Sequence, residues 1–293
     1  MRTPPRLLPA LITPFTRRGD LDLPAHVHNL TTLWERGIRG FLLGGSTGEG
    51  PYLEPGERRA LTATARETLG RRTFLMTGVA AESTRAALAQ TAEAVEGGAD
   101  AVLVLTPTTL VRGRNGLVVG FFREVADRAG IPVFLYSVPV VTAYSLADGA
   151  IDELRRLPGV VGMKDSGGDA VRILRTVAAH DDGFLVFNGA SASVALAMGA
   201  GAHGAITASA NYAVPLLAEL TSRPGRSPTA VTAAQRRLTE LTQVVEAHGV
   251  AGTKAASAVV GLAPGTPRRP LRPVGRGAAR AIEAALRDAG LSG

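Results

Sequence analysis

Eight short apolar runs, separated by longer stretches rich in alanine and leucine, occupy the chain from its N-terminus to about residue 225. The runs are residues 8–13, 40–43, 74–79, 101–105, 133–136, 160–164, 184–187 and 204–206. Short apolar runs that alternate with helical stretches are typical of repeated βα units, which build parallel sheets. Eight such units predict an α/β protein with a closed (β/α)8 TIM barrel.

Helix signals fill the stretches between the runs. Ser83 suits an N-cap and Pro55 suits a first helical turn. The predicted helices include residues 24–36, 54–69, 83–96 and 169–179. From about residue 228 onward no strand-like run follows, and the predicted helices are residues 229–247, 253–261 and 274–288. We therefore expect a catalytic barrel at residues 1–225 and a C-terminal helical subdomain at residues 226–293.

A doubly wound open sheet is the structural alternative. Such a sheet commonly carries a glycine-rich dinucleotide turn after its first strand. In this chain the first run leads into Thr13-Pro14-Phe15-Thr16 instead. The sequence therefore favours the closed barrel.

Composition excludes several classes of function. The chain contains no cysteine, which excludes disulfides, thiolate nucleophiles and cysteine metal sites and fits a reducing cytoplasm. No apolar run approaches the roughly 20 residues needed to span a bilayer. Five histidines are scattered, and His26 and His28 would not share a helix face. We expect a cytoplasmic protein without a membrane partner, metal or cofactor.

The net charge of +7 invites a comparison with nucleic-acid-binding proteins. Arginines occur singly or in pairs, as in Arg58-Arg59 and Arg155-Arg156, and aromatic residues make up only 4% of the chain. No recognisable binding motif accompanies them. We therefore expect no nucleic-acid partner.

Lysine is rare in this chain, with two lysines among 32 basic residues. Lys164 closes the apolar run Val160-Val161-Gly162-Met163, where a buried strand would open into a loop. An amine in such a place can lose its proton through desolvation and attack a carbonyl, whereas a guanidinium stays charged. The alternative is a structural lysine that extends its ammonium to solvent. The second lysine, Lys254, is expected to open a C-terminal helix in a structural role.

Tyr136 closes the run that precedes the run of Lys164, 28 positions earlier. In a (β/α)8 barrel the chemistry lies at the carboxyl ends of the strands, so neighbouring strands would aim both side chains into one mouth. A phenol beside an amine suits the proton transfers of imine chemistry. The alternative is a rim tyrosine whose hydroxyl lies in water.

A glycine-rich turn, Gly44-Gly45-Ser46-Thr47-Gly48-Glu49-Gly50, follows the second run. Free backbone N–H groups and hydroxyls in such a turn bind small anions. The spacing matches neither a P-loop nor a dinucleotide motif, so a substrate carboxylate fits better than a nucleotide phosphate. The structural alternative is a tight βα turn with a helix cap.

These motifs, taken together, resemble those of the dihydrodipicolinate synthase and N-acetylneuraminate lyase family of Schiff-base aldolases over essentially the whole chain. The matching segments, in the family's order and spacing, are residues 13–15, 45–49, 136–139, 162–166 and 204–206. The resemblance implies a (β/α)8 barrel with a C-terminal helical subdomain, assembled as a homodimer or homotetramer. It also implies a small-molecule 2-oxo acid of the pyruvate type as substrate.

The resemblance also implies roles for individual residues. Lys164 would form the imine with the 2-oxo carbon, and Tyr136 would move the protons. The substrate's carboxylate would bind at Ser46 and Thr47, near the carbonyl of Ile206, while Ser166 and Gly189 would face the variable end of the substrate.

Two departures from the family pattern bear on the substrate. Val141 stands where dihydrodipicolinate synthases carry a carboxylate-binding arginine, and Thr108 and Thr109 stand where they carry a pair of tyrosines. Residues 136–139 and 161–169 are similar to the 4-hydroxy-2-oxoglutarate aldolase branch. We therefore expect an aldolase or lyase of that type.

Two alternatives to this function stay open at this point. One is 4-hydroxy-tetrahydrodipicolinate synthase, which condenses pyruvate with aspartate semialdehyde, if Arg112 or Arg114 replaces the missing arginine. The other is a non-catalytic barrel that binds a 2-oxo acid.

Overall fold

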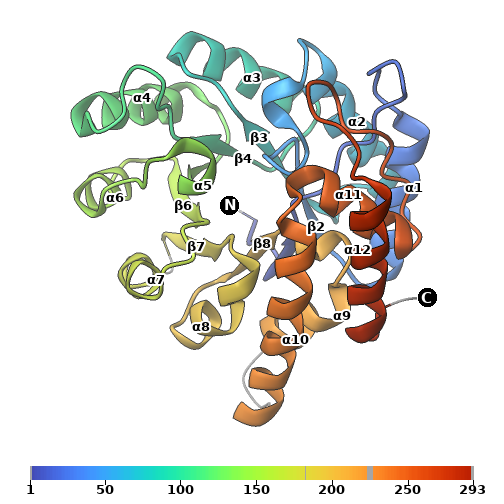
Figure 1. Cartoon of the computed structure of the whole chain (residues 1–293). Coiled ribbons are helices and arrows are strands. Elements are labelled where there is room, and N and C mark those ends of the chain that lie inside the picture. Colours follow the sequence, from blue (N-terminus) through green and yellow to red (C-terminus); the bar gives the residue numbers. More distant parts are fainter. Residues whose placement is uncertain (1, 182, 223–226, 292–293) are drawn as a thin grey trace.

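The computed structural model describes residues 2–181, 183–222 and 227–291 of the 293-residue chain. In this part of the chain, eight parallel strands form one sheet in the order β1-β8-β7-β6-β5-β4-β3-β2 (Figure 1). A parallel bridge between Ala10 and Leu42 joins β1 to β2. The backbone N–H of Leu11 also donates to the carbonyl of Leu42 over 2.9 Å. The sheet therefore closes, and the predicted (β/α)8 TIM barrel is confirmed.

The elements alternate along the chain as the apolar runs predict. The strands are β1 (Leu7–Pro9), β2 (Gly40–Leu43), β3 (Phe74–Val79), β4 (Ala101–Leu105), β5 (Val133–Ser137), β6 (Val160–Asp165), β7 (Leu185–Asn188) and β8 (Gly204–Thr207). The helices around them are α1 (Leu23–Glu35), α2 (Glu57–Leu69), α3 (Thr84–Glu96), α4 (Asn115–Arg128), α5 (Pro139–Thr142), α6 (Asp148–Leu154), α7 (Ala170–Val177), α8 (Val194–Gly199) and α9 (Val214–Thr221). Three 3-10 turns, η1 (Gly50–Tyr52), η2 (Ser191–Ser193) and η3 (Ser209–Asn211), follow β2, β7 and β8.

Large side chains fill the interior of the barrel. Phe134 and Phe187 pack edge to face with their ring centroids 6.0 Å apart. Tyr136 and Ile206 belong to the same buried cluster. Because the strands are buried on both faces, they read as continuous apolar runs rather than as alternating ones. A packed interior leaves the carboxyl-end rim as the place for chemistry.

Several predicted boundaries shift by a few residues for local reasons. The Ser83 hydroxyl caps α3 by accepting from the N–H of Ala86, as predicted. The predicted start of a helix at residue 54 is wrong, because Gly56 adopts φ 88° and α2 begins after it. Lys254 lies in the middle of its helix and does not open it. Strands β5 and β6 continue one residue beyond Tyr136 and Lys164.

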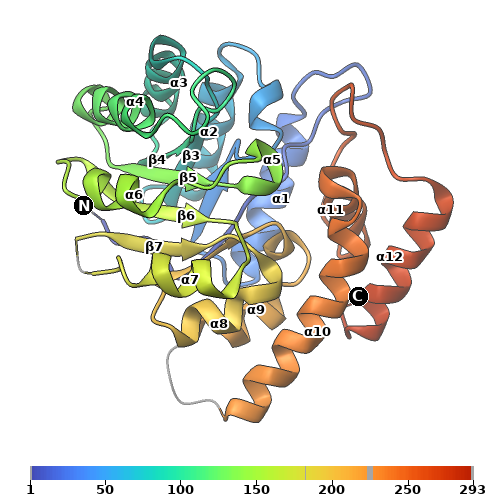
Figure 2. The same cartoon turned by 60° about the vertical axis from the view of Figure 1, so that its left-hand side comes forward.

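Three further helices, α10 (Pro228–Glu246), α11 (Gly249–Val259) and α12 (Arg276–Asp288), lie together beside the barrel (Figures 1 and 2). Leu238 of α10 and Ile282 of α12 share a buried cluster with Leu216 and Leu217 of α9. The C-terminal helices are therefore packed onto the barrel through a continuous apolar core. The predicted boundary between residues 225 and 226 lies outside the described residues.

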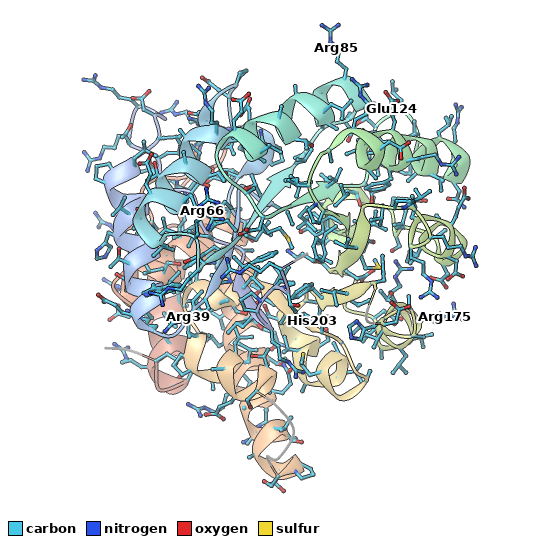
Figure 3. The ribbon with its side chains drawn as sticks, turned by 180° about the vertical axis from the view of Figure 1, so that it is seen from behind. Arg39, Arg66, Arg85, Glu124, Arg175 and His203 are labelled. Atoms are coloured by element: carbon cyan, nitrogen blue, oxygen red, sulfur yellow. The ribbon has the colours of Figure 1, made fainter. Side chains whose placement is uncertain are left out.

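Exposed arginines are dispersed over the molecular surface. Arg39 before β2, Arg85 on α3 and Arg175 on α7, which are all exposed, lie well apart (Figure 3). Within residues 2–181, 183–222 and 227–291, no helix combines the length and the apolar character that crossing a membrane requires.

Candidate active site

Lys164 and Tyr136 lie side by side in the barrel. They are register partners on the adjacent strands β6 and β5, and both side chains point to the interior face. The ammonium nitrogen of Lys164 donates to the Tyr136 hydroxyl over 3.3 Å and lies 4.5 Å from the centre of its ring. Lys164 is 4% exposed and Tyr136 is 5% exposed. A buried, hydrogen-bonded pair does not fit a lysine that extends into solvent or a tyrosine whose hydroxyl lies in water.

Ser46 brings the glycine-rich turn to the same phenol. Its hydroxyl donates to the Tyr136 hydroxyl over 3.4 Å, and Ser46 and Thr47 are both half-buried. The turn is too tight for side chains at its later glycines. A β-carbon at Gly48 would lie 2.7 Å from the carbonyl oxygen of Leu11, and one at Gly50 would lie 2.0 Å from that of Gly44. Glycine is therefore required by the close approach of backbone to backbone.

Glu49 connects the glycine-rich turn to the C-terminal part of the chain through two contacts of its carboxylate. Its backbone adopts the left-handed conformation with φ 57°, which strains a residue other than glycine. One of its carboxylate oxygens pairs with the ammonium of Lys254 at 2.6 Å. The other accepts from the backbone N–H of Arg268 over 2.7 Å. The structural role predicted for Lys254 is thus a buried ion pair that fixes the turn of Ser46.

The remaining predicted site residues gather around the lysine. A β-carbon at Gly189 would lie 2.6 Å from Cε of Lys164 and 2.0 Å from Oγ of Ser166. The Ser166 hydroxyl is buried and has no hydrogen-bond partner among the described residues. Ile206 is fully buried in the same interior cluster as Tyr136. The fold therefore brings all seven predicted residues to one end of the barrel.

An ion pair beside Lys164 was not found by reasoning from the sequence. Asp165 is 5% exposed and accepts from the Nε and Nη2 atoms of Arg172 over 3.0 and 2.9 Å. Its second oxygen accepts from the N–H of Gly167 over 2.8 Å. Because Asp165 follows Lys164 directly, this pair fixes the end of β6 and the loop that carries Ser166. The sequence does contain a signal for this pair, namely Asp165 directly after Lys164 and Arg172 in the first turn of the next helix.

The three positions that depart from the family pattern have distinct surroundings. Val141 is 58% exposed on the short helix α5. Thr108 is buried and Thr109 is exposed, and both donate their backbone N–H groups to Glu82 over 2.9 and 2.8 Å. The candidate substitutes Arg112 and Arg114 are both exposed on the loop after β4.

Possible metal-ligand side chains do not cluster in the described ranges. No group of three or more His, Cys, Asp and Glu side chains there is arranged to hold a metal ion. His26 is buried against the carbonyl of Leu61, and His28 contacts the carbonyl of Gly261. Burial lowers the pKa of His26 to about 4, so it packs as a neutral imidazole.

We predict a large loss of turnover when Tyr136 is changed to phenylalanine. The variant keeps the ring that packs in the barrel but removes the hydroxyl shared by Lys164 and Ser46. Loss of one general acid–base group costs on the order of 100-fold or more in kcat. Steady-state kinetics would measure this loss, with KM expected to change little. The control is Tyr144→Phe, whose hydroxyl bonds Asn115 instead; an equal loss in both variants would contradict the role of Tyr136.

Comparison with known proteins agrees with this geometry. The sequence pattern of the dihydrodipicolinate synthetase family matches residues 3–289. A 4-hydroxy-tetrahydrodipicolinate synthase of Jannaschia sp. (strain CCS1) is 32% identical over 289 residues, which cover 97% of this chain and 98% of that protein. Its counterpart in Thiobacillus denitrificans is 33% identical over 292 residues, which cover 97% of this chain and 96% of that protein.

Solved structures are similar over the same extent. The chloride-inhibited dihydrodipicolinate synthase of Acinetobacter baumannii, complexed with pyruvate, matches with a TM-score of 0.90 at 25% identity. The match covers 99% of this chain and 100% of that chain. The chain therefore belongs to the dihydrodipicolinate synthetase family, and the prediction of an enzyme of the Schiff-base aldolase type, a carbon–carbon lyase, is confirmed at the level of that family.

Proposed function

We propose that the chain is a lyase that forms or cleaves a C–C bond next to a pyruvyl unit through an imine on Lys164. The observation that carries the proposal is the buried contact of 3.3 Å between the amine of Lys164 and the Tyr136 hydroxyl. The unpartnered Ser166 hydroxyl and the turn of Ser46 lie beside that pair. The pyruvate bound to the Acinetobacter baumannii relative supports a pyruvyl substrate.

The chemistry follows from these groups. The neutral amine of Lys164 attacks the 2-oxo carbon, and the carbonyl oxygen leaves as water after it has received protons that Tyr136 delivers. The resulting iminium withdraws electrons, so the adjacent carbon can lose a proton or a C–C bond to give an enamine. Ser46 and Thr47 with their backbone N–H groups hold the substrate's carboxylate. The enamine carbon then takes up a proton or adds to an aldehyde, which restores the iminium, and hydrolysis of the iminium releases the product and the amine.

For the second substrate we propose an aldehyde of the kind released from 4-hydroxy-2-oxoglutarate. Val141 on α5 provides no arginine where a synthase would bind the carboxylate of aspartate semialdehyde. The shorter aldehyde released from 4-hydroxy-2-oxoglutarate also carries a carboxylate, which would bind at another group. Thr109 offers no phenol to a proton relay, and its N–H is occupied by Glu82. These two positions weigh against the synthase pattern, and the aldolase is our proposal on that ground.

The second candidate is condensation of pyruvate with aspartate semialdehyde. The names of the relatives from Jannaschia sp. and Thiobacillus denitrificans favour it. A turnover assay separates the candidates: the aldolase releases pyruvate from 4-hydroxy-2-oxoglutarate, whereas the synthase consumes pyruvate only when aspartate semialdehyde is present. Activity confined to the second assay would overturn our assignment of the substrate.

Borohydride trapping tests the imine itself. We expect incubation with pyruvate and borohydride to add one reduced pyruvyl group to Lys164, detected by peptide mass mapping. The chain has only one other lysine, so the map is simple to read. Absence of an adduct on Lys164 would overturn the proposed function. Assembly as a homodimer or homotetramer stays a prediction, which light scattering would check.

A further inference from the structure

Glu246 is a carboxylate that the chemistry above does not use, and it comes from the C-terminal helix α10. It is the last residue of that helix, where the negative end of the helix dipole disfavours an acidic side chain. The pKa of its carboxyl group is raised, because burial outweighs the hydrogen bond from Ser191 and the charge of Lys164, which both lower it. A carboxylate kept in an unfavourable place needs a compensating partner.

A short chain of contacts connects Glu246 with the site. The Ser191 hydroxyl donates to Oε1 of Glu246 over 2.6 Å. Ser191 lies two residues after Gly189, whose backbone packs against Cε of Lys164. Gln235, three helical turns before Glu246 on the same face of α10, donates to the carbonyl of Ser191 over 3.1 Å. Helix α10 therefore makes two hydrogen bonds, through Glu246 and Gln235, to Ser191 in the segment that begins beside Lys164.

Hydroxyl groups extend this contact. Ser191 also shares a hydrogen bond of 2.8 Å with Ser209, which in turn donates to Thr207 over 3.0 Å. Ser191 uses its one proton on Glu246, and Ser209 has one proton for its two neighbours, Ser191 and Thr207. The hydroxyl that binds the carboxylate is itself buried and contacts a second buried hydroxyl. Such an arrangement keeps a negative charge at a defined position.

Few charged side chains lie near Lys164 and Glu246. Among the residues that the structure describes, no carboxylate is in ion-pair contact with Lys164, because the neighbouring Asp165 faces Arg172. The charge of Lys164 on β6 acts on Glu246, and the charge of Glu246 acts on Tyr212 at the end of η3. Burial and then the charge of Glu246 raise the pKa of Tyr212 well above its usual value, so its phenol stays neutral. Among the described residues, Lys164 is therefore the cation whose charge acts on Glu246.

We propose that Glu246 is the counter-ion of Lys164, positioned by Ser191. Its carboxylate stabilises the positive nitrogen, first as the ammonium of the free enzyme and then as the iminium of the bound 2-oxo acid. The second half of this inference rests on the imine proposed above, whereas the first half does not. The C-terminal helices thus supply a charge to the barrel's site as well as apolar cover.

The test measures the reactivity of Lys164 in the intact chain without substrate. Trace labelling with acetic anhydride over a series of pH values, followed by peptide mass mapping, gives the apparent pKa of Lys164. In Glu246→Gln the amide oxygen still accepts from Ser191, but the negative charge is gone. Because an opposite charge favours the ammonium, we expect the apparent pKa of Lys164 to fall by about one unit. At a fixed lower pH, labelling of Lys164 is then faster by up to about tenfold.

The matched control is Glu240→Gln, which makes the same change on an exposed part of the same helix. We expect its labelling profile to match that of the parent. Ser191→Ala keeps the charge but frees the carboxylate, so it should shift the profile in the same direction by less, and it serves as the second variant if Glu246→Gln does not fold. A profile of Glu246→Gln that superimposes on that of the parent would overturn the proposal.

Borohydride trapping with pyruvate separates this inference from the proposed function. If the parent forms no adduct on Lys164, the aldolase assignment fails, whereas the labelling profiles still decide whether Glu246 and Lys164 are coupled. If the parent forms the adduct, we expect Glu246→Gln to form it several-fold more slowly although its amine labels faster. These opposite directions distinguish loss of a counter-ion from general damage to the site. Equal trapping rates would contradict a role of Glu246 at the iminium.

Discussion

Replacement of Lys164 by arginine is expected to abolish adduct formation with pyruvate and to reduce turnover by at least about 1000-fold. Arginine keeps a positive charge and a long side chain, but its guanidinium does not lose its proton to become a nucleophile. Loss of the nucleophile removes the covalent route altogether, and the groups that remain can only bind and polarise the substrate. Borohydride trapping and steady-state kinetics measure the two effects separately.

The interpretation of the Lys164→Arg variant depends on an intact fold. The barrel around Lys164 is tightly packed, so circular dichroism and the melting temperature should accompany the kinetics. Lys254 serves as the internal reference, because it should carry no adduct in the parent or in the variant. Turnover above about a tenth of the parent value, or an adduct that moves to Lys254 with activity retained, would show that Lys164 is not the nucleophile.

The largest loss of stability is expected when the buried pair of Glu49 and Lys254 is broken. Their side chains are 0% and 3% exposed and lie 2.6 Å apart. Burial lowers the pKa of Lys254, and the charge and hydrogen bond of Glu49 oppose that shift. Removal of one partner leaves an uncompensated buried charge, which costs about 3–5 kcal/mol. For Glu49→Gln this corresponds to a fall of roughly 10 °C in melting temperature.

Two comparisons test whether the loss of stability in Glu49→Gln comes from the unpaired charge of Lys254. The control is Glu96→Gln, which breaks an exposed pair with Arg59 and should cost less than about 1 kcal/mol. The double variant Glu49→Gln with Lys254→Met should lose less stability than the two single changes added together, because neither charge is then left alone. Thermal and denaturant unfolding would measure the parent, the two single variants of the pair, the double variant and the control. Additive losses would show that the two charges do not depend on each other.

The barrel and the centre of the site could be predicted from the sequence because both depend on short-range patterns. Buried parallel strands read as apolar runs, and each run marks one βα unit. Tyr136 and Lys164 come one unit apart, so adjacency of strands was enough to place them together. The glycine-rich turn was visible for the same local reason.

Contacts between distant segments could not be predicted in the same way. Nothing local in the sequence links Glu246 with Ser191 or Glu49 with Lys254, since each pair meets only after the C-terminal helices have packed on the barrel. The start of one helix was also predicted wrongly, because it depends on the backbone conformation of the residue before it. Residue 54 was expected to open a helix, but the left-handed Gly56 delays the start of α2.

Glu49 is bound by Lys254 and Arg268, which are among the last residues of the chain to be synthesised. A ribosome releases the turn of Ser46 early, and Tyr136 and Lys164 follow it long before the C-terminal residues that brace Glu49. A nascent chain that ends before residue 254 therefore contains Lys164 and Tyr136 but a glycine-rich turn without its support. Synthesis of residues 254 to 268 supplies both groups that brace Glu49. The turn beside Tyr136 is thus completed only in about the last seventh of translation.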